Sequence, residues 1–357
     1  MCDLIRRGLK TDIRAAMLNR RNFLRATTAA TLTMAVAPGM LGMMGNGTAA
    51  AAGKEITATH GAGFCNLNLF LSHVLHTVKD EGVDLKLITT PTFADEVTMI
   101  GAGQIDVGIM PYTTFLALAD AGVPVKIIGG GGVGGVGIVA PPGLKTPADF
   151  KGKILGTFQN DTLEIMAYDW FKKNGVAYKD LQVRYFDTTP ESAQAFMSGA
   201  VDILTTIEPY GTIIMKDKPG TVMLSDGTDV YGTPHYSDCI LGVRAGLLEE
   251  NPAAVKALIK GMMEAQLVAE LDPDGTLTKL LGSYYKTDME RGKIAMSKQP
   301  SVIDARNQEK FIMDRGQSLM EMGYIKKKPD ASVIDWTFLN QVIAENPDLY
   351  AKLKYKS

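Results

Sequence analysis

Two stretches of this chain repeat the same order of residues and constrain its fold more than any other feature. The first is Ala102–Tyr112 (AGQIDVGIMPY) and the second is Ser198–Tyr210 (SGAVDILTTIEPY). In each, a glycine suited to ending a helix precedes an aspartate, a strand with β-branched residues and a proline suited to opening a helix. Asp106 and Asp202 hold equivalent positions in the two stretches. The repeat predicts two α/β halves, each directing a helix start toward a shared ligand cleft.

The chain opens with residues typical of an export signal. Arg20-Arg21-Asn22-Phe23-Leu24-Arg25 is a twin-arginine motif, and the mildly apolar run that follows, residues 26–37, is too short to span a membrane. Small residues at 49–52 provide a cleavage site. We therefore expect residues 1–52 to be a signal peptide that directs the folded protein to the periplasm. The alternative is a chance arginine pair in a basic tail.

Composition narrows the possible functions. Hydrophobic residues make up 46% of the chain, charged residues 21%, and the net charge is −2. These values are ordinary for a globular protein and favour neither a nucleic acid nor a membrane surface as a partner. Cys2 lies in the predicted signal, which leaves Cys65 and Cys239 as two cysteines that either pair in an oxidising compartment or stay free.

Strand and helix patterns alternate after residue 53. Expected strands cover residues 55–59, 84–89, 103–110, 125–128 and 137–140, then 154–157, 181–186, 201–207, 221–224 and 237–243. The clearest expected helices cover residues 64–78, 162–173, 191–197, 253–270, 304–322 and 333–343. Such alternation predicts mainly parallel sheets with helices on both faces.

Six short motifs follow one another between residues 55 and 270. They are EGVDLKLI, AGQIDVGIMP, AGVPVKII, TPADFKGKILGT, SGAVDILTTIEPY and EENPAAVKALI. In this order they resemble the substrate-binding proteins of nitrate, sulfonate and taurine ABC importers and their pyrimidine-binding relatives. The resemblance implies the α/β fold of type II periplasmic binding proteins, in which two lobes enclose one ligand.

The same resemblance implies how the chain is divided. Residues 53–140 would form the first part of lobe 1, residues 141–238 lobe 2, and residues 239–357 a return to lobe 1 with C-terminal helices on it. The two crossings between lobes would lie near residues 139–142 and 238–243. The implied function is capture of a small molecule for an ABC permease in the inner membrane. The alternative is a periplasmic sensory protein or a ligand-processing enzyme on the same fold.

Other motifs in the sequence could indicate a nucleotide site, a metal site or an enzyme. Gly132–Gly137 (GVGGVG) matches a dinucleotide fingerprint, but a strand and Pro141-Pro142 follow it instead of a helix. Close approach of the backbone to a ligand or hinge explains these glycines better. His73 and His76 are spaced i, i+3 without a third ligand, so no metal is expected. Neither G-x-S-x-G nor H-E-x-x-H occurs, so we expect no enzyme and no cofactor.

Ligands of open α/β sheets bind beyond the carboxyl ends of strands, where helices start. Five such loops here contain neither Arg nor Lys, which favours a heteroaromatic or amine ligand, with a small organic anion as the alternative. Glu208 would bind a ligand N–H or pair with a cation of the protein. We also expect a monomer. The predicted ligand-binding residues are Phe64, Cys65, Asn66, Phe93, Met110, Tyr112, Thr113, Gly132, Gln159, Asn160, Thr162, Glu208 and Tyr210.

Replacing both Arg20 and Arg21 with lysine is expected to block export, because the twin-arginine pathway reads the arginine pair. The measurement is the amount of protein in the periplasmic fraction, together with N-terminal sequencing of the exported wild type. The sequence should begin near Gly53, and periplasmic protein that begins at Met1 would contradict the prediction.

Overall fold

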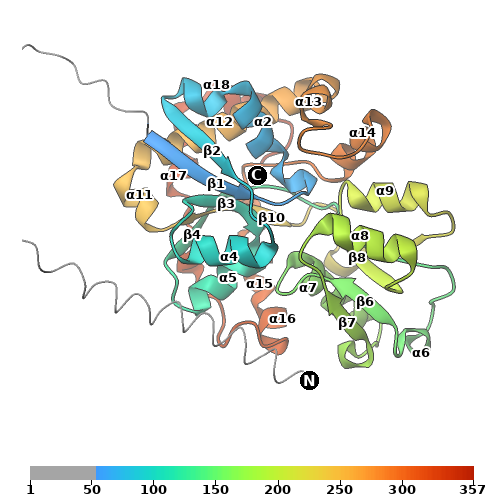
Figure 1. The fold of residues 1–357 in the computed structure, drawn as a ribbon. Helices are drawn as coiled ribbons and strands as arrows, with labels where there is room; N and C mark the ends of the chain where they lie inside the picture. Colours follow the sequence, from blue (N-terminus) through green and yellow to red (C-terminus); the bar gives the residue numbers. More distant parts are fainter. Residues whose placement is uncertain (1–53) are drawn as a thin grey trace, which may run out of the picture. The chain divides into compact units, whose positions relative to one another are not determined.

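The computed structural model describes residues 54–357 (Figure 1). The predicted signal peptide, residues 1–52, lies outside the described residues. Within residues 54–357, the strands form two five-stranded sheets. None of the helices in this part of the chain combines the length and apolar character needed to cross a membrane.

The first sheet has the strand order β2-β1-β3-β10-β4. β1 (Lys54–His60) pairs in parallel with β2 (Val83–Ile88) on one side and β3 (Val107–Pro111) on the other. β10 (Cys239–Arg244) runs antiparallel between β3 and β4 (Val125–Gly130). Most of these strands are buried and rich in β-branched residues, as expected for strands covered on both faces.

The second sheet repeats this arrangement with the order β7-β6-β8-β5-β9. β6 (Ile154–Thr157) lies in parallel between β7 (Gln182–Tyr185) and β8 (Ile203–Ile207), and β5 (Val136–Ala140) runs antiparallel between β8 and β9 (Val222–Ser225). In each sheet four strands share one direction, as expected for a mainly parallel sheet, and one strand runs against them, so both sheets are mixed. In each sheet the antiparallel strand is the one that enters directly from the other sheet.

The first change of sheet lies upstream of the expected place. β4 ends at Gly130 and β5 begins at Val136, so residues 131–135 form the crossing, whereas the sequence predicted residues 139–142. Gly134 and Gly135 explain the shift, because both have positive φ (63° and 72°), a backbone conformation that turns the chain before β5. The return occupies residues 226–238 and ends where the expected crossing at 238–243 begins.

Asp106 and Asp202, the equivalent aspartates of the repeat, each bind the neighbouring parallel strand. The Asp106 carboxylate accepts hydrogen bonds from the backbone N–H (3.0 Å) and hydroxyl (2.9 Å) of Thr57 in β1, and from Nε of Arg244 (2.7 Å). The Asp202 carboxylate accepts a hydrogen bond from the backbone N–H of Ile154 in β6 (2.8 Å). The sequence repeat is therefore also a repeat of structure.

Helices follow the carboxyl ends of the parallel strands in both sheets. α4 (Phe93–Gly101) and α5 (Tyr112–Asp120) follow β2 and β3, and α7 (Thr162–Lys173), α8 (Thr189–Ser198) and α9 (Tyr210–Asp217) follow β6, β7 and β8. The remaining short elements are η2 (Tyr178–Asp180), α6 (Pro147–Phe150), α10 (Thr228–Tyr231), α11 (Gly246–Glu250) and η4 (Ala331–Val333).

Two expected helices are interrupted. The segment at 64–78 is divided into η1 (Phe64–Asn66), α2 (Leu67–Leu75) and α3 (Thr77–Asp80). His76, which adopts a left-handed conformation with φ 60°, separates α2 from α3. His73 and His76 therefore do not share one continuous helix face. The expected helix at 304–322 is likewise divided, into η3 (Arg306–Gln308), α15 (Glu309–Asp314) and α16 (Gly316–Glu321).

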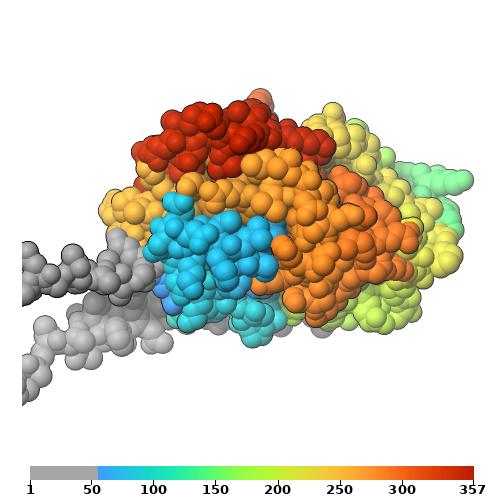
Figure 2. Space-filling model, turned by 90° about the horizontal axis from the view of Figure 1, so that it is seen from above, coloured from blue at the N-terminus to red at the C-terminus, as the bar shows by residue number. Residues whose placement is uncertain are grey.

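The C-terminal helices pack mainly on the first sheet's helices. α12 (Pro252–Leu271) is largely buried and contacts α2, α3 and α17 (Thr337–Glu345). Figure 2 shows this orange and red part of the chain beside the early helices in blue. α13 (Pro273–Leu280), α14 (Met289–Lys298) and α18 (Pro347–Lys352) complete the set. α14 also contacts α9, and α16 contacts α7, so this region joins elements of both sheets.

Asp106→Ala is expected to lower the free energy of unfolding by about 2–3 kcal/mol, because it removes a charged acceptor and leaves a strand N–H unpaired. The measurement is urea denaturation. Asp84→Ala, at an exposed position of β2, is the matched control and should change stability by less than about 0.5 kcal/mol. Equal losses in the two variants would show that Asp106 does not hold the strand pair.

Candidate functional site

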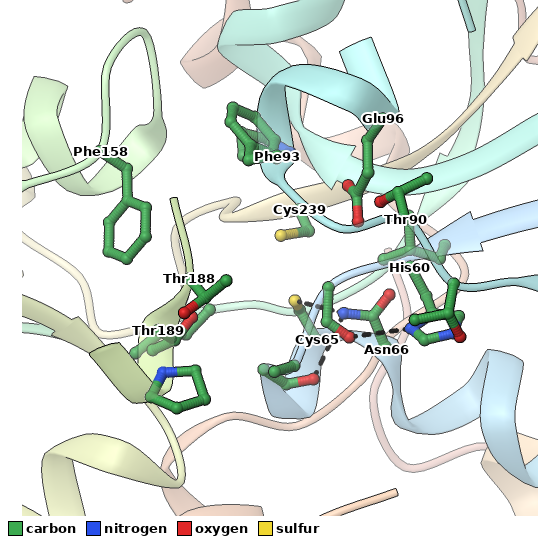
Figure 3. A pocket seen from close by; sticks show the side chains of 18 of the residues that line it. His60, Cys65, Asn66, Thr90, Phe93, Glu96, Phe158, Thr188, Thr189 and Cys239 are labelled. Atoms are coloured by element: carbon green, nitrogen blue, oxygen red, sulfur yellow. Dashed lines mark hydrogen bonds between the residues drawn. The ribbon is translucent and has the colours of Figure 1, made fainter. Parts of the chain in front are cut away.

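A cavity of about 540 Å³ lies where the strand ends of both sheets meet. Loops after β1, β2, β6 and β7 line it, together with the ends of β3 and β8 and the start of β10. This is the place expected for a ligand of an α/β sheet, beyond the carboxyl ends of parallel strands. Figure 3 shows part of the lining, with side chains from both halves directed into the same space.

Cys65, Asn66 and Phe93 are the predicted residues that line this cavity. The other predicted positions at the first sheet are buried beside it. Phe64 stacks on Tyr285 with ring centroids 4.3 Å apart, and Tyr112 packs edge-on against Phe311. Met110 is fully buried, whereas its strand neighbours Ile109 and Pro111 line the cavity. Alternation along a strand explains the difference, because successive side chains point to opposite faces.

The predicted residues around residue 160 lie near the cavity but do not line it. The Thr113 hydroxyl donates to the backbone carbonyl of Asn160 (2.7 Å), and the Thr162 hydroxyl donates to Oδ1 of Asp238 (2.5 Å). These bonds join the first sheet's segments to the start of α7. Gln159 precedes this contact and is not part of the lining. The intervening Asp161 lines the cavity instead.

Gly132 has a packing role. A Cβ atom at this position would lie 2.5 Å from Cβ of Cys65, so the crossing segment passes close to η1 only because residue 132 is glycine. The backbone N–H of Asp238 also donates to the Gly132 carbonyl (3.1 Å). The glycine-rich stretch therefore brings backbone segments together, which was one of the two interpretations of the GVGGVG sequence.

Glu208 has protein partners, which corresponds to the second of its two expected roles. Its carboxylate accepts a hydrogen bond from the backbone N–H of Thr212 (3.0 Å) and lies 3.3 Å from Nζ of Lys298. The side chain is buried and does not line the cavity. Tyr210, at the start of α9, is half-buried and also outside the lining. Lys298 lies at the end of α14, far along the chain, so no local pattern indicated the pair.

The cavity carries acidic groups. Glu96, Asp161 and Asp187 line it, and no lysine or arginine is among the described lining residues. Burial raises the pKa of Glu96 to about 7, opposed by the nearby hydroxyls of Thr90 and Thr59. Burial also raises the pKa of Asp161 to about 8, and it lowers the pKa of His60. A dehydrated, acidic wall disfavours an anion and favours a cation or an N–H donor.

One buried polar atom at the cavity has no partner. Oδ1 of Asn66 forms no hydrogen bond among the described residues, and the hydroxyls of Thr90 and Thr59 have only the Glu96 carboxyl group nearby. Such atoms are costly unless something binds them. Aromatic rings surround them: Phe93 and Phe158 face the cavity from different halves (Figure 3), and Phe70 stacks on Tyr284 at 4.5 Å.

The cavity contains residues that sequence reasoning did not single out, including Glu96, Thr90, Phe158 and the two threonines at 188 and 189. A signal for some of them exists in the repeat. Thr89-Thr90-Pro91 follows β2 and Thr188-Thr189-Pro190 follows β7, and both triplets line the cavity from equivalent places. Extending the repeat upstream of the two aspartates would have identified them. Glu96 has no such signal, because an acidic residue in a first helical turn is usually exposed.

Known proteins share both sequence and fold with this chain. A protein named "Putative binding protein" from Brucella abortus is 26% identical over 243 residues, which cover 68% of this chain and 69% of the relative. The periplasmic aliphatic sulphonate binding protein SsuA from Escherichia coli matches with a TM-score of 0.64 at 18% identity, covering 78% of this chain and 91% of SsuA. The periplasmic nitrate-binding protein NrtA from Synechocystis matches with a TM-score of 0.70 at 14% identity, covering 85% of this chain and 92% of NrtA.

At 18% and 14% identity, the two solved structures establish the fold of this chain but not its ligand. Both are periplasmic binding proteins, so the two mixed sheets described above have the architecture of type II periplasmic binding proteins. The model of one family, described as NMT1/THI5 like, matches residues 78–275, more than half of the chain. This segment contains most of the cavity loops and both stretches of the repeat. The chain belongs to the NMT1/THI5-like family.

Proposed function

We propose that this protein is the solute-binding component of an ABC importer and captures a small neutral or cationic organic molecule that carries N–H groups. After twin-arginine export it works in the periplasm as a monomer and delivers its solute to an inner-membrane permease. Family membership and the names of the fold neighbours, which bind sulphonate and nitrate, support the role in capture. The two sheets serve as the cores of two lobes that close on the solute.

The proposed class of solute is inferred from the charged residues that line the cavity. Its described lining includes Glu96, Asp161 and Asp187 but neither lysine nor arginine. Recognition of a sulphonate or carboxylate favours arginine, because two parallel N–H groups match two oxygens. An anion here would meet no countercharge and would further disfavour ionisation of Glu96 and Asp161, whose pKa values burial already raises to about 7 and about 8. An amine or a protonated ring nitrogen would instead favour the ionised form of these carboxyl groups and gain a charge-assisted hydrogen bond.

The shape and polar atoms of the cavity suit a flat heteroaromatic ring. Phe93 and Phe158 offer two aromatic faces from opposite halves. Oδ1 of Asn66 and the carboxylate of Glu96 accept hydrogen bonds, and the Thr90 hydroxyl donates one. A volume of about 540 Å³ is within the range of small-molecule sites. Oδ1 of Asn66 would then gain the partner that the protein does not supply.

Capture without chemical change is the simplest use of this site. The named sequence relative and the two fold neighbours described above are binding proteins, and the cavity acids come from both halves of the structure. Recovery of the unchanged solute after prolonged incubation supports capture, and conversion to a product supports the enzyme alternative. A sensory role on the same fold predicts equally tight binding but no dependence of uptake on the protein in cells.

Heteroaromatic amines and pyrimidines are expected to raise the melting temperature of the purified protein, whereas sulphonates and nitrate should not. A ligand at about 100 times its Kd stabilises the folded state by about 2.7 kcal/mol, which a thermal-shift screen detects. The same compounds tested on Phe158→Ala should give a smaller shift, because one aromatic face is lost. Stabilisation by sulphonate or nitrate alone would contradict the proposed solute class.

Glu96→Gln is expected to remove a pH dependence of stability in the solute-free protein. Because the pKa of Glu96 is raised from 4.5 to about 7, the folded state holds a proton that the unfolded state has released. Wild-type stability should therefore fall as pH rises from about 4.5 to 7, and at pH 8 the variant should be more stable by about 2–3 kcal/mol. Urea denaturation across this range is the measurement.

Glu96→Gln also separates stability from binding. Affinity for a cationic solute should fall by about tenfold or more in the variant, although its fold is more stable at pH 8, because a charge-assisted hydrogen bond is lost. Asp84→Asn, at an exposed position of β2, is the control for charge alone and should alter neither property. If the free energy of unfolding changes with pH in the same way in Glu96→Gln and in the wild type, Glu96 does not hold the proton in the folded state.

A further inference from the structure

We propose that Cys65, Asp238 and Cys239 form a binding site for a thiophilic divalent metal ion, with Zn²⁺ as its representative, at the inner end of the cavity. One donor atom from each residue lies within 4.8 Å of the other two. Cys65 lies in η1, and Cys239 is the first residue of β10. The site therefore joins the first loop of the chain to the segment that returns from the second sheet.

The two sulfur atoms are accessible to an ion that enters the cavity. Both cysteines are free thiols, and both line the cavity although they are otherwise buried. Figure 3 shows their sulfur atoms near each other in the space between the two halves. Zn²⁺ binds thiolate at about 2.3 Å and carboxylate oxygen at about 2.0–2.2 Å. Three donors this close together reach one such ion with small side-chain rotations.

The charge around the cysteines provides the second, independent argument. Asp238 is 0% exposed and Asp161, which follows β6 into the same region, is 6% exposed. Neither forms an ion pair with a lysine, arginine or histidine among residues 54–357, although other buried acids of this chain do, such as Glu208 and Asp304. A buried carboxylate without a countercharge is costly. A bound divalent cation would supply that countercharge for Asp238.

Neighbouring groups already hold the donors in place. The amide Nδ2 of Asn66 donates to Sγ of Cys65 (3.3 Å), and Nε2 of Gln299 donates to Oδ2 of Asp238 (3.0 Å). Thr162 donates to the other carboxylate oxygen (2.5 Å). Outer partners of this kind orient metal ligands and are a regular part of metal sites. Each carboxylate oxygen keeps a further lone pair for the ion.

Metal binding at this site requires proton release and no electron transfer. Each thiol loses its proton as its sulfur forms a bond to the ion, so two protons leave for solvent and no oxidant is needed. Two thiolates and one carboxylate would leave a fourth tetrahedral position for water or another ligand. The site goes beyond the proposed capture of an organic solute and does not depend on it. The histidine pair considered in the sequence, His73 and His76, takes no part.

The test uses the mature protein, reduced and freed of metal, titrated with Co²⁺ and then with Zn²⁺. Thiolate ligation of Co²⁺ should produce a sulfur-to-cobalt charge-transfer absorption that Zn²⁺ abolishes at one equivalent. Competition with a chromophoric chelator measures the Zn²⁺ affinity. Cys65→Ser, Cys239→Ser and Asp238→Asn should each lower that affinity at least tenfold. Asp187→Asn, which removes a cavity carboxylate outside the cluster, is the matched control and should change it less than threefold.

Wild-type protein provides a readout that needs no variant. Zn²⁺ should protect both cysteines from alkylation under native conditions and raise the melting temperature, and it should do neither for Cys65→Ser. Absence of the charge-transfer absorption, or equal Zn²⁺ affinity in the wild type and the double cysteine variant, would overturn the proposal. One equivalent of Zn²⁺ should slow the formation of a Cys65–Cys239 disulfide by oxidised glutathione. An unchanged rate of disulfide formation would also overturn the proposal. Capture of the organic solute is measured separately in metal-free wild-type protein, so that the two proposals can fail independently.

Discussion

The carboxylate of Asp238 is the point on which the arrangement of the two halves depends. It lies fully buried just before β10 and accepts hydrogen bonds from Thr162, at the start of α7, and from Gln299, after α14. Its backbone N–H donates to Gly132 in the first crossing. Segments from both sheets and from the C-terminal helices therefore meet at one side chain. Removing it would take one acceptor from each of two donors, Thr162 and Gln299, and loosen the junction beside the cavity.

The same junction sets the electrostatic character of the cavity. Acidic groups from both halves face a space that contains no described lysine or arginine, and the basic partner of the buried Glu208 lies outside it. The architecture is shared with proteins named for sulphonate and nitrate, but architecture alone does not define a solute. In this chain the loops at the strand ends place carboxyl groups and two Thr-Thr-Pro segments at the cavity. The proposed preference for uncharged or positive solutes rests on these side chains and not on the shared fold.

Much of the fold could be predicted from the sequence because it depends on local patterns. Gly103 and Gly199 adopt positive φ, 68° and 80°, where the repeat predicted helix ends, and α7 begins and ends at the expected residues. Side-chain direction was not predictable in the same way. Met110 and Ile109 are adjacent in one strand, yet only Ile109 reaches the cavity. Glu208 is paired with Lys298, ninety positions away, and contacts of that separation leave no trace in a local pattern.

The central claim is that the cavity holds a solute without net negative charge, in contact with Glu96 and between Phe93 and Phe158. A crystal structure of the protein purified from its native periplasm, combined with mass spectrometry of the released molecule, tests it most directly. The account predicts a single nitrogen-containing molecule whose N–H group lies within hydrogen-bond distance of the Glu96 carboxylate. A sulphonate, nitrate or carboxylate anion in that cavity, or a solute bound elsewhere on the chain, would contradict it.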